Sequence, residues 1–306
     1  MRTHVLCLIL TAFATTTIYS QNIFNPADPQ VRYDSTTPLG SATRPNPAVL
    51  GLQKWVSVPT NGVSSSFDAS SYKAYFINVA GRRMPFRLKF PNSYTNPDSV
   101  NKRYPIMMFF HGAGEPGCLS NGGIYNNEKQ LLHGGKTFMD RVDNNQFDGF
   151  LLYPQAYVAN CSNFWGTAYD NAINAVLDSL VKYVRMDQDR LFVNGLSDGG
   201  RTTWRYARTF PTRVARVGPS AMSAMTTSLS SMIHIPVWFA TGGRDTNPSP
   251  EQAQETLTIF TNLGGNIRYT IFPTLGHGVW NQHWAEPDYV PFMNGTHKAQ
   301  PLVYFN

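Results

Sequence analysis

From residue 104 onward, short apolar runs alternate with longer segments in which apolar residues are spaced by three and four positions. The short runs are predicted to be buried strands, at residues 106–110, 149–153, 191–193, 237–240 and 267–272. One apolar stripe predicts a helix over residues 168–184 and consists of Tyr169, Ile173, Val176, Leu177, Leu180, Val181 and Val184. Ser249-Pro250-Glu251 is typical of the start of another helix, and Gly264-Gly265 of its end. This alternation predicts an α/β fold, with a mostly parallel central sheet and helices on both faces.

The chain before residue 104 has other patterns. Residues 72–77 and 84–90 alternate between apolar and polar side chains around a turn with Ala80-Gly81, which predicts an antiparallel hairpin at the edge of the sheet. Another strand is predicted at residues 55–58. Residues 21–51 are rich in Pro, Asn, Ser and Thr and show no sustained period, so we interpret them as an irregular N-terminal arm.

Residues 1–20 have the pattern of a secretory signal peptide. Arg2 precedes an apolar run over residues 5–14, and small or polar residues follow up to Ser20. That run is too short to span a membrane and no other candidate exists, so we expect no stable membrane association. The mature protein is expected to be secreted, extracellular or periplasmic, with a single domain over residues 52–306.

Composition narrows the class of protein. Of the 306 residues, 42% are hydrophobic and 14% are charged, a balance that excludes a disordered chain and a coiled coil. The net charge is +6, but Lys and Arg are scattered rather than clustered, so no nucleic-acid partner is expected. The sequence leaves the oligomeric state open.

Two cysteines, Cys118 and Cys161, remain once the signal peptide with Cys7 is removed. Each follows a predicted strand, so both are expected in loops at the same rim of the sheet. Export to an oxidising compartment favours a disulfide between them. Two unpaired buried thiols are the alternative.

The stretch Gly195-Leu196-Ser197-Asp198-Gly199 reads Gly-x-Ser-x-Gly. An apolar run, residues 190–193, comes before it, and a segment with helical spacing, residues 203–210, comes after it. A strand, a sharp turn and a helix in this order predict a nucleophile elbow, which would present Ser197 at the top of the sheet. The glycines are required because side chains would clash in so tight a turn.

A serine nucleophile needs a base and a group that orients the base, and the sequence offers both. Asp245 lies in the loop after the strand at 237–240, and His277 lies between Gly276 and Gly278 after the last predicted strand. The order Ser, Asp, His is that of the α/β-hydrolases. All three residues would follow the carboxyl ends of strands, where open parallel sheets bind ligands. A turn or cap role before Pro248 is the alternative for Asp245.

The other histidines are weaker candidates for the base. His283 is close enough in the sequence to compete with His277, but only His277 has a glycine on each side. The remaining histidines are interpreted as structural, surface or packing residues, namely His111, His133, His234 and His297.

Two backbone N–H groups are expected to bind the oxyanion of an acyl-transfer reaction, those of Asp198 and Ala113. The carboxylate of Asp198 would oppose the negative charge of the intermediate. It also lies at a helix N-terminus, where the macrodipole favours it. We therefore expect the Asp198 side chain to point away from the reacting atoms.

With these motifs the chain resembles the secreted α/β-hydrolases known as predicted peptidases, which are related to feruloyl esterases, acetyl xylan esterases and polyhydroxybutyrate depolymerase-like enzymes. The motifs are Met84-Pro85-Phe86-Arg87-Leu88, Phe110-His111-Gly112-Ala113-Gly114-Glu115, Tyr153-Pro154-Gln155 with Trp165, Asp189-Arg190-Leu191-Phe192-Val193-Asn194-Gly195-Leu196-Ser197 and Gly276-His277-Gly278-Val279-Trp280. The resemblance implies catalytic Ser197, Asp245 and His277, and it implies that Glu115 and Trp165 lie near the substrate.

The chain departs from this family in two places. Asp198 stands where such proteins commonly have Met. The stretch from Pro291 to Asn306 lacks the usual closing helix and ends on an extended apolar run, as a segment cut from a longer secreted protein would.

The leading hypothesis is a secreted serine carboxylesterase that hydrolyses feruloyl or acetyl esters on plant polysaccharide, without a metal or organic cofactor. Aromatic residues at the rim are expected either to stack on the substrate or to pack, namely Trp165, Trp280 and Trp284. A polyester depolymerase, a serine peptidase and a catalytically dead carbohydrate-binding module are the alternatives.

Overall fold

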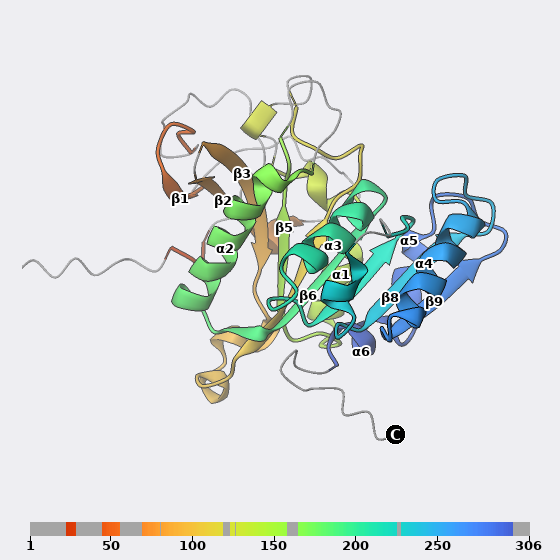
Figure 1. Ribbon diagram of the computed structural model, residues 1–306. Coiled ribbons are helices and arrows are strands. Elements are labelled where there is room, and N and C mark those ends of the chain that lie inside the picture. Colours follow the sequence, from red (N-terminus) through yellow and green to blue (C-terminus); the bar gives the residue numbers. More distant parts are fainter. Residues whose placement is uncertain are drawn as a thin grey trace, which may run out of the picture.

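The computed structural model describes residues 23–28, 45–55, 69–79, 81–118, 123–125, 127–157, 165–224 and 228–295. Within these residues the chain forms a nine-stranded sheet with the order β1-β2-β3-β5-β4-β6-β7-β8-β9 (Figure 1). The strands are β1 Gly51–Lys54, β2 Tyr72–Val79, β3 Arg82–Lys89, β4 Tyr104–Phe110, β5 Phe150–Pro154, β6 Met186–Leu196, β7 Arg216–Ser220, β8 Val237–Gly242 and β9 Ile267–Phe272. Neighbours from β1 to β5 in this order pair antiparallel, and all later neighbours pair parallel. The predicted mostly parallel sheet is confirmed.

The sequence missed strand β7. Its residues, Arg-Val-Gly-Pro-Ser, include two strand breakers, which is why the pattern did not mark them. Gly218 is needed because a Cβ there would lie 2.4 Å from the hydroxyl oxygen of Tyr289. Strand β7 is therefore formed by its neighbours β6 and β8 rather than by the preferences of its own residues.

The predicted hairpin at the N-terminal, antiparallel edge of the sheet is confirmed, and one further short strand lies outside it. Strands β2 and β3 pair antiparallel, and β1 adds to the outer side of β2, with Gly51 opposite Asn78. Of the strand predicted at residues 55–58, only Trp55 is described, and it follows β1 without belonging to it; residues 56–58 lie outside the described residues. A short polar strand such as β1 carries too little periodicity to be found from sequence.

Helices cover both faces of the sheet, as predicted. On one face lie α2 Asp170–Tyr183, α3 Asp198–Thr209 and α4 Pro250–Asn262, which are in front of the sheet in Figure 1. On the other face lie α1 Gly135–Asp143, α5 Trp280–Ala285 and α6 Tyr289–Met293. Strand β4 separates the two layers, since Ile106, Met108 and Phe110 join the core under α2 and α3. Met107 and Phe109 join the core under α1 and α5.

The helix ends follow their capping residues. Ser249 and Gln252 form a capping box at the start of α4, and Gly264, with φ of 82°, follows its end. The expectation that the stretch from Pro291 lacks a helix is wrong for its first residues, because Pro291, Phe292 and Met293 belong to α6. A proline fits there because it lies in the first turn, where a backbone N–H is not needed. Residues 296–306 lie outside the described residues.

Part of the predicted arm packs on the hairpin. The ring of Phe24 is 1% exposed and lies edge-on to Tyr75, with 5.0 Å between ring centroids. Asp28 accepts a hydrogen bond of 2.9 Å from the Tyr75 hydroxyl and pairs with Lys54 at 2.9 Å. The predicted signal peptide, residues 1–20, lies outside the described residues, and so does most of the arm.

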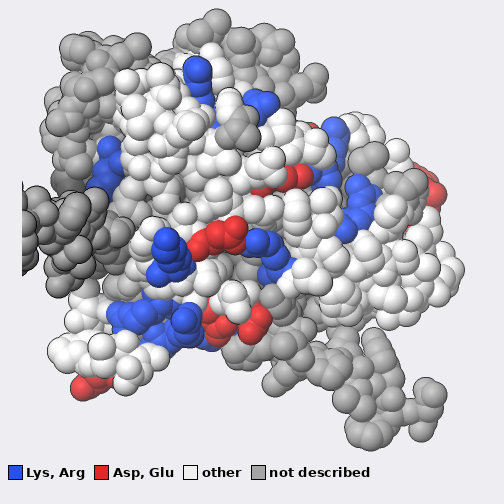
Figure 2. All heavy atoms as spheres, turned by 60° about the vertical axis from the view of Figure 1, so that its left-hand side comes forward, with Lys and Arg blue, Asp and Glu red and all other residues white. Residues whose placement is uncertain are grey.

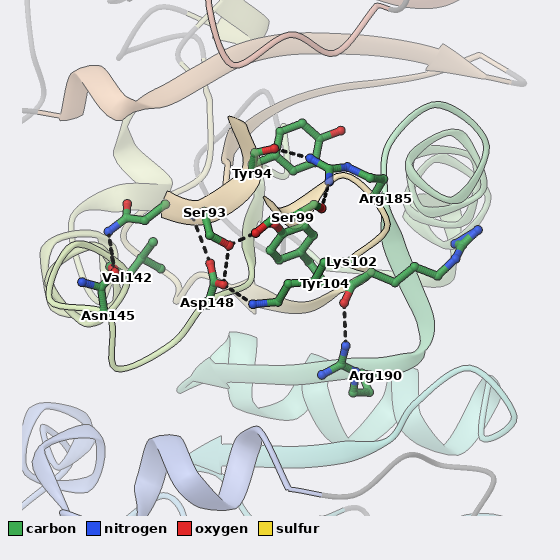
Figure 3. A network of polar contacts seen from close by, with 12 residues as sticks. Ser93, Tyr94, Ser99, Lys102, Tyr104, Val142, Asn145, Asp148, Arg185 and Arg190 are labelled. Atoms are coloured by element: carbon green, nitrogen blue, oxygen red, sulfur yellow. Dashed lines mark hydrogen bonds and ion pairs between the residues drawn. The ribbon is translucent and has the colours of Figure 1, made fainter. Parts of the chain in front are cut away.

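A network of polar contacts closes the amino-terminal ends of the central strands (Figure 3). Arg185, just before β6, donates hydrogen bonds to the carbonyl oxygens of Tyr94 and Ser99. Its guanidinium also lies 4.2 Å from the ring centroid of Tyr94. Asp148, just before β5, pairs with Lys102 and accepts a 2.6 Å hydrogen bond from the Ser93 hydroxyl. We call this set of residues the amino-end network.

Charges of both signs mix on the surface. On the face drawn in Figure 2, several Lys and Arg side chains lie directly beside Asp and Glu. Ion pairs such as Arg213 with Asp178 and Arg268 with Asp288 are examples of this mixing. No helix in the described part of the chain is long and apolar enough to cross a membrane.

Candidate active site

Ser197 lies at a sharp turn between the end of β6 and the start of α3. Its φ of 52° and ψ of −118° are a strained conformation for a residue with a side chain. Its N–H donates a 2.9 Å hydrogen bond to the carbonyl oxygen of Ser220 on β7, which fixes the turn to the sheet. The predicted order of strand, turn and helix is confirmed.

Close packing explains the glycines of this turn. A Cβ at Gly199 would lie 1.9 Å from the carbonyl oxygen of Phe110, and one at Gly195 would lie 2.6 Å from the same atom. A Cβ at Gly200 would lie 2.7 Å from the carbonyl oxygen of Ser220. Such contacts cannot be accommodated without moving the backbone, so the turn can form only with glycine at these positions.

The structure brings Ser197, His277 and Asp245 together. Nε2 of His277 lies 2.8 Å from Oγ of Ser197, and Nδ1 of His277 lies 2.8 Å from Oδ2 of Asp245. The Asp245 side chain is only 3% exposed, and its Oδ1 accepts a hydrogen bond from the N–H of Asn247. With the imidazole proton on Nδ1, the Ser197 hydroxyl can donate to Nε2, which is the arrangement that activates a serine.

The competing histidines lie elsewhere. His283 is fully buried in α5, and its Nδ1 lies 2.8 Å from Oγ of Ser220. Burial lowers the pKa of His283 to about 3, so this imidazole stays neutral. His234 is exposed in a turn before β8, and His297 lies outside the described residues.

His111 is structural, as expected. Its side chain is completely buried, and burial lowers its pKa to about 4. Nε2 accepts a 3.1 Å hydrogen bond from the N–H of Ala156, and Nδ1 lies 2.8 Å from the carbonyl oxygen of Gly112. His111 thereby holds the loop after β4, which carries the predicted oxyanion donor Ala113, against the end of β5.

Ala113 is exposed in that loop, next to the elbow. A Cβ at the preceding Gly112 would lie 2.4 Å from a methyl carbon of Leu196, so the loop runs directly against the residue before Ser197. Among the described residues, the N–H groups of Ala113 and Asp198 donate no hydrogen bond. Both groups are therefore available, and their binding of an oxyanion remains a prediction.

The Asp198 carboxylate faces Arg201 and Trp165 and has no hydrogen bond to Ser197 or His277. Its Oδ1 lies 3.4 Å from Nη1 of Arg201, and the carboxylate accepts a hydrogen bond from the backbone N–H of Trp165. Burial raises the pKa of Asp198, and Arg201 opposes that shift. The indole Nε1 of Trp165 donates a 3.0 Å hydrogen bond to the carbonyl oxygen of His111. Trp165 thus connects the loop after β4 to the start of α3.

Glu115 is buried rather than exposed to a binding cleft. Its side chain is 2% exposed, and Oε2 accepts a 2.9 Å hydrogen bond from the N–H of Gly112. Oε1 contacts Nδ1 of His133. Burial raises the pKa of Glu115, and the contact with His133 lowers it in part. The predicted substrate contact of Glu115 could therefore be only indirect, through the loop that it holds.

His133, expected to be a surface or packing residue, packs beside the site. It lies in the turn before α1, and its ring lies edge-on to Trp280, with 5.4 Å between centroids. Trp280 in turn lies edge-on to His277, at 5.9 Å. Gly134 and Gly135 follow His133 in the sequence, but Leu132 precedes it, so glycines flank this histidine on one side only.

The remaining predicted residues divide between site and core. Trp280 is partly exposed beside His277, as a substrate contact would require, whereas Trp284 is fully buried between Phe109 and Phe138.

Cys118 is buried in the loop after β4, but Cys161 lies outside the described residues, so their pairing stays a prediction. No group of three or more His, Cys, Asp or Glu among the described residues is arranged to hold a metal ion.

Comparisons with known proteins agree with this fold. No protein-family model and no curated protein match the chain. Among solved structures, it is similar to a thermostable esterase, with a TM-score of 0.56 and 21% identity over 73% of this chain and 62% of that one. It is also similar to a ferulic acid esterase, with a TM-score of 0.55 and 15% identity over 73% of this chain and 96% of that one.

A third solved structure gives the same result. It is an S-formylglutathione hydrolase from Staphylococcus aureus, with a TM-score of 0.53 and 16% identity over 73% of this chain and 98% of that one. At such identities the similarity shows the fold alone. Together with the sheet order and the elbow after β6, it places the chain in the α/β-hydrolase fold class.

Proposed function

We propose that the protein is a serine hydrolase that cleaves carboxylic esters, with Ser197 as nucleophile, His277 as base and Asp245 as the group that orients His277. The observation that carries this proposal is the continuous set of hydrogen bonds from Ser197 through His277 to Asp245. A core-packing role does not account for it, because Ser197 is held in a strained conformation and His277 is 40% exposed.

In the proposed reaction, Oγ of Ser197 attacks the ester carbonyl while its proton passes to Nε2 of His277. The N–H groups of Ala113 and Asp198 bind the oxyanion, each donor contributing about 3–4 kcal/mol. His277 then gives the proton to the departing alcohol, which leaves an acyl-Ser197 ester. A water molecule, deprotonated by His277, attacks this ester, and Ser197 regains its proton as the acid departs. Asp245 stabilises the His277 imidazolium throughout.

For the substrate we propose a feruloyl or acetyl ester on plant polysaccharide, and we propose that the protein is secreted. The ferulic acid esterase and thermostable esterase to which the chain is similar support an ester. Two indoles are partly exposed, that of Trp165 before Ser197 in the sequence and that of Trp280 after it. Such indoles can stack on an aromatic acyl group or a sugar.

A substrate panel tests this proposal. Purified protein is expected to hydrolyse p-nitrophenyl acetate and methyl ferulate, and to be far slower on a peptide p-nitroanilide. Faster cleavage of the anilide would favour a peptidase, and faster release from a polyester film would favour a depolymerase. No turnover of any ester would contradict the proposal and favour a catalytically dead module.

A further inference from the structure

The loop after β4 is closed by Glu115. Both backbone groups of Gly112 are used inside this loop: its N–H donates to Oε2 of Glu115 at 2.9 Å, and its carbonyl oxygen accepts from the N–H of Glu115 at 3.3 Å. Gly112 and Glu115 are buried, whereas Ala113 and Gly114 between them are exposed. The Glu115 carboxylate therefore occupies the Gly112 N–H, and the next donor along the exposed turn is the Ala113 N–H, which has no partner among the described residues.

Closing a turn with a buried carboxylate has a cost in free energy, because the charged group loses its contact with water. Removing a carboxylate from water costs several kcal/mol unless hydrogen bonds and an opposite charge offset the cost. Here the offset comes from the Gly112 N–H and from His133, because Nδ1 of His133 contacts Oε1 of Glu115. Among the described residues, no hydrogen bond joins Glu115 or His133 to Ser197, His277 or Asp245, so this pair has no part in proton transfer as described above.

His133 also extends the contact to the other side of the site. The ring of Trp280 lies between the rings of His133 and His277, edge-on to both. Trp280 is the first residue of α5 and follows the loop that carries His277. The pair therefore connects the loop with the predicted oxyanion donor Ala113 to the loop with the proposed base.

We propose that Glu115 and His133 are positioning residues for acyl transfer: the carboxylate sets the direction of the peptide that precedes the Ala113 N–H, and His133 holds the carboxylate. The inference rests on the proposed function. Because the pair acts on the oxyanion donor and not on ground-state binding, its loss lowers kcat and leaves KM nearly unchanged.

Two substitutions of His133 provide the test. His133→Leu removes the donor to Glu115, and kcat for p-nitrophenyl acetate is expected to fall about 10- to 100-fold, less than for complete loss of an oxyanion donor. His133→Asn keeps an N–H near the position of Nδ1, and kcat is expected to stay within about threefold of the wild type. Equal kcat values for His133→Leu and the wild type, or an equal loss in both variants, would overturn the inference.

A second pair of variants keeps the test decisive if His133→Leu does not fold. Glu115→Gln loses the charge but keeps an oxygen that reaches the Gly112 N–H, whereas Glu115→Asp keeps the charge but loses the reach. The inference predicts a higher kcat for Glu115→Gln, and a higher kcat for Glu115→Asp would contradict it. A wild type without ester turnover would instead contradict the proposed function, so the two failures are distinguishable.

Discussion

The two rims of the sheet are both rich in charged and polar side chains, but their partners differ. In the amino-end network, the charged groups of Arg185 and Lys102 each meet a carbonyl oxygen or a carboxylate, and Arg185 also stacks on Tyr94 (Figure 3). At the carboxyl-end rim, the Ser197 backbone is strained and the His277 ring is open to solvent. At the first rim the charged side chains are engaged in hydrogen bonds and ion pairs within the protein. At the second rim the His277 ring is exposed and can act on a bound molecule.

This difference shows what marks a site in such a fold. A dense polar network by itself is a structural device when all its donors are used within it. Strain at one residue, free N–H groups beside it and an exposed imidazole held by a buried carboxylate are costs to stability for which the proposed function accounts. The predictions below test whether stability and activity separate along these two rims.

The largest effect is expected at Ser197. Ser197→Ala should lower kcat about 10⁵- to 10⁶-fold, because it removes the proposed nucleophile. Its unfolding temperature should stay close to that of the wild type, since the one hydrogen bond of this hydroxyl within the described part of the chain is to His277. Ester turnover and thermal unfolding measured on the same preparation check both parts. A variant with more than a tenth of the wild-type rate would contradict the assignment.

Asp245→Asn should be the next most damaging change. The amide keeps the size of the carboxylate but favours the wrong proton position on His277, so kcat should fall by roughly 10⁴-fold. The same variant should bind substrate normally. An unchanged rate would return Asp245 to the role of a turn residue.

At the opposite rim, Arg185→Leu should lower the free energy of unfolding by about 2–4 kcal/mol, because it removes two hydrogen bonds to carbonyl oxygens and the stacking on Tyr94. At a temperature where the variant is folded, kcat should equal that of the wild type. Urea unfolding and ester turnover measure the two effects. A kcat loss without a stability loss would break the contrast between the rims.

Changes at Asp198 should be milder. Asp198→Asn keeps an oxygen that accepts from the Trp165 N–H, so we expect kcat within about threefold of the wild type. Asp198→Ala loses that contact, and kcat should fall by no more than about tenfold. A gain of more than tenfold in Asp198→Ala would mean that the carboxylate opposes the oxyanion and does not point away from it.

The smallest effect concerns pH. Burial raises the pKa of Glu115, and the hydrogen bond to Glu115 raises the pKa of His133. A group whose pKa rises on folding contributes stability at low pH that is lost as the pH rises through the raised pKa. Between about pH 5 and pH 8, the wild type should therefore lose more stability than Glu115→Gln. If the urea midpoints of the two proteins changed equally between these pH values, this prediction would be refuted.

Patterns in the sequence predicted the elements that are regular and locally specified. The apolar run at residues 267–272 and the capped helix that begins after Ser249 agree with β9 and α4. The predicted burial of residues 267–272 is wrong, because β9 is the last strand of the sheet and its residues are all partly or fully exposed. Strand β7 was missed because Gly218 and Pro219 are unfavourable in strands, so that β7 forms through its pairing with neighbouring strands. Strand β1 was missed because a polar strand of four residues has no measurable period. Those elements depend on tertiary contacts, which a single sequence does not display.

The proposed site shows the same division. Ser197, Asp245 and His277 could be found because each follows a strand and the order along the chain is distinctive. His133 could not be ranked, because its importance comes from Glu115 and Trp280, which are distant in the sequence. Trp284 could not be told from a rim residue, since an indole fits a core and a binding surface equally well.

The most direct test of the central claim is labelling with a fluorophosphonate, followed by mass spectrometry of the intact protein and its peptides. We predict one label per chain, located on Ser197, with parallel loss of ester turnover and no labelling after His277→Ala. Labelling at another residue, or none in a folded protein, would contradict the assignment of Ser197, His277 and Asp245 as the reacting group.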